Sequence, residues 1–113
     1  MSKLYTLKKN NEFKKVYSRG RSVAGQSIVL YFLPGITGRK NFGFSVGKKV
    51  GKAVVRNRVK RVLRELCRIN QHCFKDGYDY VLIPRKGFVG RSFKQLGEEL
   101  FKLTGKAFKN EIK

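Results

Sequence analysis

Three stretches of the chain have patterns that predict β-strands: two place successive side chains on alternate faces with a period of two, and the third is a compact apolar run. The first stretch, 22–33, is a β-rich hairpin region, one face of which carries Ile28, Leu30 and Phe32. The second, 42–46, has apolar side chains on one side and only glycine and serine on the other, so we expect a shallow, open face there. The third, 78–83, is a compact apolar strand that ends at a proline.

Two further stretches place apolar residues three and four positions apart, the spacing of amphipathic helices. The longer one carries its stripe at Val55, Val59, Val62, Leu63, Leu66 and Ile69. The last helix follows Ser92, which has capping-box form with Gln95, and its apolar face would comprise Phe93, Leu96, Leu100, Leu103 and Ala107. A short first helix is expected from Asn10 or Asn11 through about Tyr17, because asparagine is a preferred N-cap. The order helix, hairpin region, strand, long helix, strand, helix predicts an α+β sandwich.

The charge balance indicates that this is not an ordinary small domain but one whose stability or function needs a polyanion. The 113 residues include 27 Lys and Arg but 7 Asp and Glu, a net charge of +20. Such an excess opposes compact folding by self-repulsion, and nucleic acid is the partner that would relieve it. A membrane is the rival partner, but no apolar run approaches the roughly 18 residues of a spanning helix. The first twenty residues also lack the apolar stretch of a signal peptide.

The two cysteines favour a reducing compartment. Cys67 and Cys73 are six residues apart, about 9 Å along a helix, which is too far for an undistorted disulfide. We therefore expect free thiols and a location in the cytoplasm.

Cations concentrate between Lys48 and Arg64, where eight occur without a single acid. One row, four residues apart, consists of Lys52, Arg56, Lys60 and Arg64. A second row beside it consists of Arg58, Arg61 and Arg68. Like charges at this spacing destabilise an isolated helix, so the rows indicate a face that meets phosphates, which arginine binds through two parallel hydrogen bonds. Asn57 could either hydrogen-bond the turn or contact RNA.

Aromatic residues supply a second candidate surface. Phe13 and Tyr17 are one turn apart on the first helix, and Tyr31 lies on the strand face opposite Leu30. Both faces of a sheet cannot be equally buried in a chain this small, so we expect some of these rings to line a groove. Rings in a groove stack on unpaired bases of any sequence. For Phe13, a core position that pins the helix is the alternative.

The residues for protein-based catalysis or a resident metal are missing. The acids are scattered, whereas hydrolysis by two metal ions needs several converging carboxylates. His72, the only histidine, has no evident partner, and zinc-ligand spacing is absent. We therefore expect no catalytic residue and no stably bound metal.

One long segment resembles a known family. Residues 42–65, FGFSVGKKVGKAVVRNRVKRVLRE, are similar to the signature of the bacterial ribonuclease P protein component, with Arg56-Asn57-Arg58 at the core. The resemblance covers nearly the whole chain, including 7–17 and 78–83. Two positions depart from it: Tyr17, where members often carry phenylalanine, and Gly47, where serine is commoner.

The resemblance implies an α-β-β-β-α-β-α two-layer sandwich, like a ribosomal-protein domain, with a left-handed β-α-β crossover against the usual hand. The length of the chain predicts one domain over 1–113, which we expect to bind RNA, and its lysines predict a basic arm over 1–9. Members bind the catalytic RNA of ribonuclease P and the single-stranded 5′ leader of precursor tRNA, while the RNA carries out the cleavage with Mg²⁺. No membrane or further protein partner is expected.

By position, the resemblance assigns the leader to Phe13, Tyr17 and Tyr31. It assigns binding of the RNA subunit to a set of residues that we call the cationic segment. These are Lys48, Lys49, Lys52, Arg56, Asn57, Arg58, Lys60, Arg61, Arg64 and Arg68. Two other classes of function stay open: a small ribosome component or RNA chaperone without a leader groove, and a protein metallonuclease that would be active without RNA.

Overall fold

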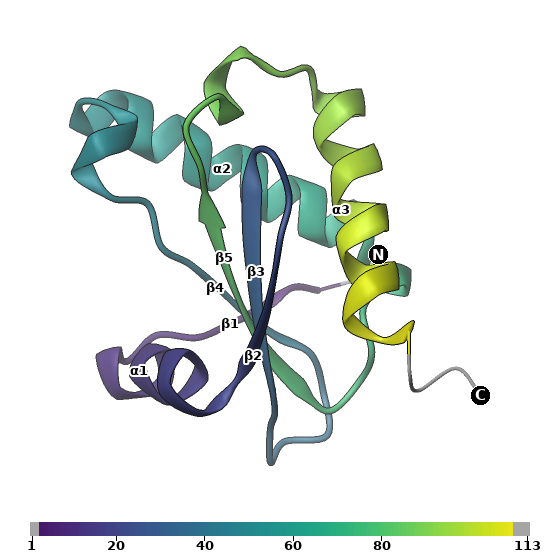
Figure 1. Ribbon diagram of the computed structural model, residues 1–113. Helices are drawn as coiled ribbons and strands as arrows, with labels where there is room; N and C mark the ends of the chain where they lie inside the picture. The colour runs from purple at the N-terminus through teal and green to yellow at the C-terminus, as the bar shows by residue number, and fades with distance from the viewer. Residues whose placement is uncertain (1–2, 110–113) are drawn as a thin grey trace.

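The computed structural model describes residues 3–109, and its elements follow the predicted order with one addition (Figure 1). The strands are β1 (Tyr5–Thr6), β2 (Arg21–Ala24), β3 (Ile28–Pro34), β4 (Asn41–Phe44) and β5 (Tyr78–Pro84). The α-helices are α1 (Asn10–Arg19), α2 (Ala53–Ile69) and α3 (Phe93–Ala107). Three short 3₁₀ turns are η1 (Lys48–Val50), η2 (Gln71–Cys73) and η3 (Phe88–Gly90). The addition is β1, which precedes the first predicted helix.

The five strands form one mixed sheet in the order β1-β4-β5-β3-β2. β3 pairs antiparallel with β2 and β5, whereas β4 runs parallel to β1 and β5. Because α2 connects β4 to β5, the crossover joins two neighbouring parallel strands. The α+β sandwich is therefore confirmed, and the hand of the crossover stays a prediction.

The segment expected to be a basic arm is attached to the sheet. Tyr5 and Thr6 pair with β4, the Leu7 N–H donates to the Phe42 carbonyl at 2.8 Å, and the Leu7 side chain is buried. A strand of two residues has no periodicity that a sequence pattern could detect. Its pairing depends instead on the free edge that β4 offers.

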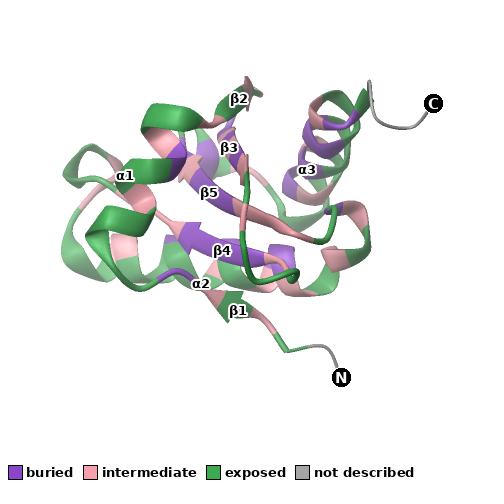
Figure 2. Ribbon diagram, turned by 90° about the horizontal axis from the view of Figure 1, so that it is seen from below, coloured by how far each residue is buried: buried purple, intermediate pink, exposed green. Residues whose placement is uncertain are grey.

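The two faces of the sheet are buried to different extents. On one face Phe32, Phe42 and Tyr80 lie in register across three strands, and α2 and α3 cover them in the main core. On the other face α1 and the preceding Leu7 pack against the sheet, in a small cluster around Val16 and Val81. Figure 2 shows buried segments along β4, β5 and the inward side of α3, while α1 is largely exposed. The unequal burial expected from the size of the chain is confirmed, and the side of α1 is left available for function.

The first helix begins at Asn10, as predicted, but its N-cap residue and its end differ from the prediction. Lys9 rather than an asparagine occupies the N-cap, and Glu12 Oε1 accepts the Lys9 N–H at 2.9 Å and the Lys8 N–H at 3.0 Å. These hydrogen bonds, of which the one from Lys9 has the larger effect, hold the pKa of Glu12 below its ordinary value. Their contribution to the stability of the fold is therefore lost as the pH falls through that lowered pKa. The helix continues to Arg19, two residues beyond the expected end.

Two apolar positions at helix ends were predicted wrongly. Ile69, the last residue of α2, is 49% exposed, and Phe93, the first residue of α3, is 44% exposed. In the same terminal turns, Leu66 and Leu96 are the side chains that face the core. Cys67 is buried in place of Ile69, and desolvation raises the pKa of its thiol. Both cysteines are free thiols, as predicted.

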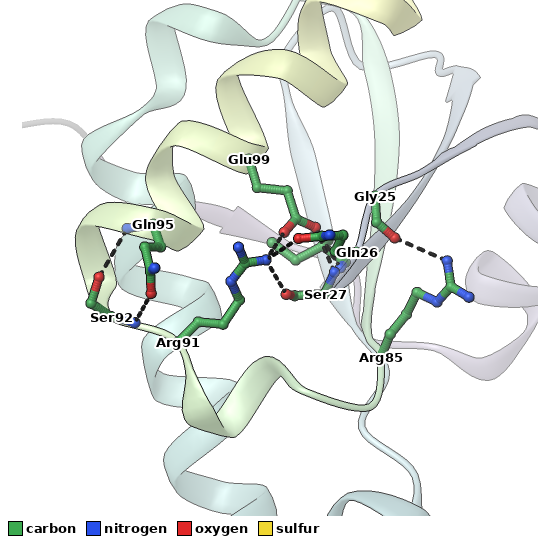
Figure 3. A network of polar contacts seen from close by, with 9 residues as sticks. Gly25, Gln26, Ser27, Arg85, Arg91, Ser92, Gln95 and Glu99 are labelled. Carbon is green, nitrogen blue, oxygen red and sulfur yellow. Dashed lines mark hydrogen bonds and ion pairs between the residues drawn. The ribbon is translucent and has the colours of Figure 1, made fainter.

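A polar network fixes α3 against the β2–β3 turn (Figure 3). Glu99 Oε2 accepts the backbone N–H groups of Ser27 and Ile28, each at 2.8 Å, and Glu99 Oε1 lies 3.3 Å from Arg91 Nη1. The same Arg91 nitrogen donates to Gln26 Oε1 at 2.9 Å and to Ser27 Oγ at 3.0 Å. At the start of α3, the predicted capping box of Ser92 is confirmed.

We expect Glu99→Gln to lower the free energy of unfolding by about 2 kcal/mol, because a carboxylate accepting two amides and facing an arginine is replaced by a neutral group. Urea denaturation followed by circular dichroism measures the loss. Glu98→Gln is the matched control, since it changes the net charge equally at an exposed neighbour. Equal stability of the two variants would show that the network does not hold α3.

Candidate nucleic-acid interface

The cationic segment lies on the surface over most of its length. Two of its residues are half-buried, Arg56 and Arg68. The others are exposed, namely Lys48, Lys49, Lys52, Asn57, Arg58, Lys60, Arg61 and Arg64. We call this surface of η1 and α2 the cationic face. With no acid in the first turn of α2 and no side chain capping it within the described residues, the positive end of the helix dipole adds to the same field.

The turn between η1 and α2 places the lysines of η1 beside the helix. Gly51 has a φ of +152°, and a Cβ there would lie 3.1 Å from Val55, so the tight turn requires glycine. Arg56 Nη1 donates to the Gly51 carbonyl at 2.9 Å and braces the turn from within the helix. Val50 packs against the main core and anchors η1. Arg56 therefore has a structural role that the sequence did not indicate.

Arg68 differs from the other described cations of this segment because it is paired with a carboxylate. Its Nε and Nη2 donate to the two carboxylate oxygens of Glu65 at 2.9 and 2.6 Å. This pairing with Arg68 holds the pKa of Glu65 below its ordinary value. Contact between Arg68 and a phosphate, which the sequence predicts, would require this ion pair to open or to be shared.

A shallow groove of about 400 Å³ runs between α1 and the end of β4 and reaches α2. Phe13 and Tyr17 line it, as the sequence predicts for a groove of rings. Its remaining lining residues are Asn10, Lys14, Phe44, Ser45, Val46 and Lys60. Lys60 belongs both to this aromatic groove and to the cationic face, so the two predicted surfaces are continuous.

Gly43 determines where Phe13 lies. A Cβ on Gly43 would lie 2.7 Å from the ring of Phe13, so glycine allows the ring to rest on the strand. The open face expected at 42–46 is thus filled at Gly43, which is buried, and remains open at Ser45. Phe13 combines the two roles that the sequence left as alternatives, because one side of its ring packs on the sheet and it also lines the groove.

Tyr31 supports the groove from the sheet. Its ring meets that of Tyr17 edge to face, with centroids 5.0 Å apart and an interplanar angle of 80°, and it is not among the residues that line the groove. In the sheet, Tyr31 and Gly43 both pair with Val81. This row of three residues across the strands lies beneath the side chains of α1, namely Tyr17, Val16 and Phe13. The sequence missed the groove residues Lys14, Phe44 and Val46, because only the packing of α1 across the strands brings them together.

Most of the acids that the structure describes make structural contacts, and they are not gathered into a site. Asp79 Oδ1 accepts from the Asn41 side chain at 2.9 Å, and Asp76 lies 3.8 Å from Lys40 Nζ. Over residues 3–109 no three His, Cys, Asp or Glu residues are grouped closely enough to hold a metal ion. The donor set of this part of the chain therefore does not fit a magnesium site. Within the same residues, no helix has the length and apolar content to cross a bilayer.

An α+β sandwich with an unbalanced cationic helix beside an aromatic groove defines a nucleic-acid-binding protein. The family profile described as ribonuclease P matches residues 1–108. The chain belongs to the ribonuclease P protein family. Its members are the protein components of a ribonucleoprotein endoribonuclease that processes the 5′ end of tRNA, and their partner is the ribonuclease P RNA.

Relatives of known sequence and structure agree with this assignment. The ribonuclease P protein component of Pelotomaculum thermopropionicum is 43% identical over 95% of this chain and 96% of its own. That of Clostridium perfringens is 46% identical over 92% of this chain and 89% of its own. The solved ribonuclease P protein of Thermotoga maritima superposes with a TM-score of 0.81 at 30% identity, covering 89% of this chain and 96% of its own. The solved ribonuclease P protein of Staphylococcus aureus superposes with a TM-score of 0.80 at 31% identity, covering 93% of this chain and 96% of its own.

We expect Arg58→Ala to weaken binding to the ribonuclease P RNA and to reduce the slope of log affinity against log salt by about one unit, because one phosphate contact and its released counterion are lost. A filter-binding titration at several salt concentrations measures both. Arg39→Ala removes the same charge from the exposed β3–β4 loop, outside the cationic face, and should leave the slope nearly unchanged. A slope unaltered by Arg58→Ala would remove this residue from the interface.

Proposed function

We propose that the cationic face binds the ribonuclease P RNA and that the adjacent aromatic groove binds the single-stranded 5′ leader of precursor tRNA. The observation that carries this proposal is the position of Lys60, which belongs to both surfaces. A substrate strand in the groove would therefore lie directly beside the RNA that carries out the cleavage. The chain would work in the cytoplasm, where its free thiols are stable.

Three features of the groove support an unpaired strand as its ligand. The groove is open and shallow, which suits a flexible chain better than a compact small molecule. Phe13 and Tyr17 offer ring surfaces on which any base can stack. Lys14 on α1 and Lys60 on α2 provide cations for the phosphates. None of these contacts reads base edges, so the groove would accept leaders of different sequence.

The groove also explains how precursor and mature tRNA would be told apart. Both share the tRNA body, but only the precursor has nucleotides that can occupy the groove. Tyr31 would act on the leader by holding the ring of Tyr17 in place from the sheet, in addition to any direct contact. Binding energy gained from the leader alone would favour substrate over product.

The protein would assist chemistry that the RNA carries out. Ribonuclease P is a magnesium-dependent ribonuclease, and we assign its magnesium ions to the RNA because the described acids of this chain do not converge. Exposed cations on α2 would reduce the repulsion between phosphates of RNA and substrate. The groove would hold the strand in register with the cleavage site, which removes part of the entropic cost of the reaction.

Replacing Phe13 or Tyr17 by leucine should weaken precursor binding to the reconstituted holoenzyme about tenfold, with mature tRNA binding unchanged, because stacking on the leader is lost while apolar volume is kept. The affinities of both ligands are measured side by side with each variant. Tyr5→Leu is the matched control, since this exposed ring lies on β1, outside the groove. Equal losses for precursor and mature tRNA would assign the two rings to the fold instead of the leader.

The purified protein without RNA should not cleave precursor tRNA, and at low magnesium it should increase cleavage by the RNA subunit, because its cations replace part of the counterion screening. A cleavage assay with and without each component measures this. RNA-free cleavage that survives nuclease controls would indicate a metallonuclease. Sequencing of co-purified RNA that returns ribosomal RNA without ribonuclease P RNA would indicate a ribosome component or RNA chaperone.

A further inference from the structure

The outer side of α3 carries two phenylalanines that the core does not use. Phe93 is 44% exposed and Phe101 is 67% exposed. They are eight residues apart, so their Cα atoms stand about 12 Å apart along the helix axis, with Gly97 midway between them. We call the surface of Phe93, Gly97 and Phe101 the α3 platform. It lies apart from the aromatic groove, which is lined by α1, β4 with the residues after it, and α2.

Gly97 has no structural reason to be glycine. Its backbone is helical, and a Cβ at this position would meet no atom within 4 Å. Glycine inside a helix is less stable than alanine, so the fold alone favours alanine here. A bare stretch of backbone between two exposed rings instead permits a ligand to approach the helix closely.

Two open hollows border the platform. One, of about 510 Å³, has Gly97 at its floor between Phe101, Lys94, Glu98 and Lys102. The other, of about 380 Å³, lies between the two helices and is lined by Phe93 together with Arg61, Val62, Arg64 and Glu65. Since Arg61 and Arg64 are part of the cationic face, the α3 platform continues that face onto the next helix.

The charges around the rings determine which partner fits. Lys94 and Lys102 flank the first hollow, and its one acid is Glu98. In the second hollow, the charge of the acid Glu65 is already paired, because two guanidinium nitrogens of Arg68 donate to its carboxylate. A second copy of a chain with a net charge of +20 would be repelled from this surface. Exposed rings flanked by cations match unpaired nucleotides, whose bases stack and whose phosphates are neutralised.

We propose that the α3 platform binds unpaired nucleotides of the ribonuclease P RNA. Bases stack on Phe93 and Phe101, the strand passes close over Gly97, and Lys94, Lys102, Arg61 and Arg64 neutralise its phosphates. This inference rests on the proposed contact of the cationic face with the same RNA, because Arg61 and Arg64 border both surfaces. The α3 platform adds a stacking contact to an interface whose other contacts are electrostatic. Stacking would fix the position of an unpaired loop of the RNA.

The first test removes the rings. Phe93→Leu and Phe101→Leu should each weaken binding of the full-length protein to the ribonuclease P RNA by about tenfold, the loss of one stacked base. Phe101→Trp should retain the affinity of the wild type, because it restores a stacking surface. The preference of the holoenzyme for precursor over mature tRNA should not change, whereas Phe13→Leu, the reciprocal control, should change that preference alone.

The second test adds a single methyl group. Gly97→Ala should raise the midpoint of thermal unfolding by about 4 °C and at the same time weaken RNA binding, because the methyl group occupies the path of the strand. Gly105→Ala is the matched control: it also has open space around its Cβ and does not line the hollow, so it should stabilise the helix without changing affinity. Unchanged RNA affinity in Gly97→Ala would overturn the role of the bare backbone.

The outcomes separate this inference from the proposed function. If Arg58→Ala weakens RNA binding while both leucine variants bind normally, the α3 platform is overturned and the cationic face stands. If Arg58→Ala has no effect while the leucine variants bind weakly, Arg58 is removed from the interface, and the α3 platform stands together with Arg61 and Arg64. If sedimentation equilibrium shows a wild-type dimer that Phe101→Leu dissociates, the occupant is a second copy and the RNA proposal is wrong.

Discussion

Like charges repel along α2, and the rest of the molecule depends on the packing that overcomes this repulsion. Each like-charged pair four residues apart costs roughly 0.2–0.5 kcal/mol. Each apolar side chain buried beneath the helix contributes roughly 1.5–3 kcal/mol. Val59, Leu63 and Leu66 form the buried stripe of α2 in the main core. Their burial is therefore sufficient to hold the cations of the helix in fixed positions. A disordered segment of equal charge would attract RNA but could not present its arginines at fixed spacing.

The scarcity of acids follows from the same requirement. Among the acids that the structure describes, Glu12 caps α1, Glu65 pairs with Arg68, and Glu99 joins α3 to the β2–β3 turn. Each carboxylate thus stabilises an end or a joint of the fold, where two or three donors converge on it. Little negative charge remains to offset the cationic face. The fold is stabilised by a few well-placed acids, while the surface keeps the field that a polyanion needs.

Apart from β1, the strands and α-helices were predictable from the sequence because their patterns are local. The stripe of α2, the capping box at Ser92 and the alternation in β3 each depend on residues near one another in the chain. The site was predictable only in part, because its geometry depends on register. That Lys60 lines the aromatic groove, and that Tyr31 lies behind Tyr17, follows from the way α1 crosses three strands. No pattern within a single segment contains that information.

Charge and stacking contribute different things to recognition here. Electrostatic attraction acts over about 8–10 Å at physiological salt and is indifferent to register, so the cationic face alone would bind many RNAs in many positions. Rings act only in contact, and each is fixed by its neighbours: Phe13 rests on Gly43, and Tyr17 is braced by Tyr31. In the proposed function, a strand bound to these rings beside Lys60 would have its position defined relative to RNA on α2. In this proposal, precise placement of a substrate by so basic a protein would therefore depend on its few fixed aromatic side chains.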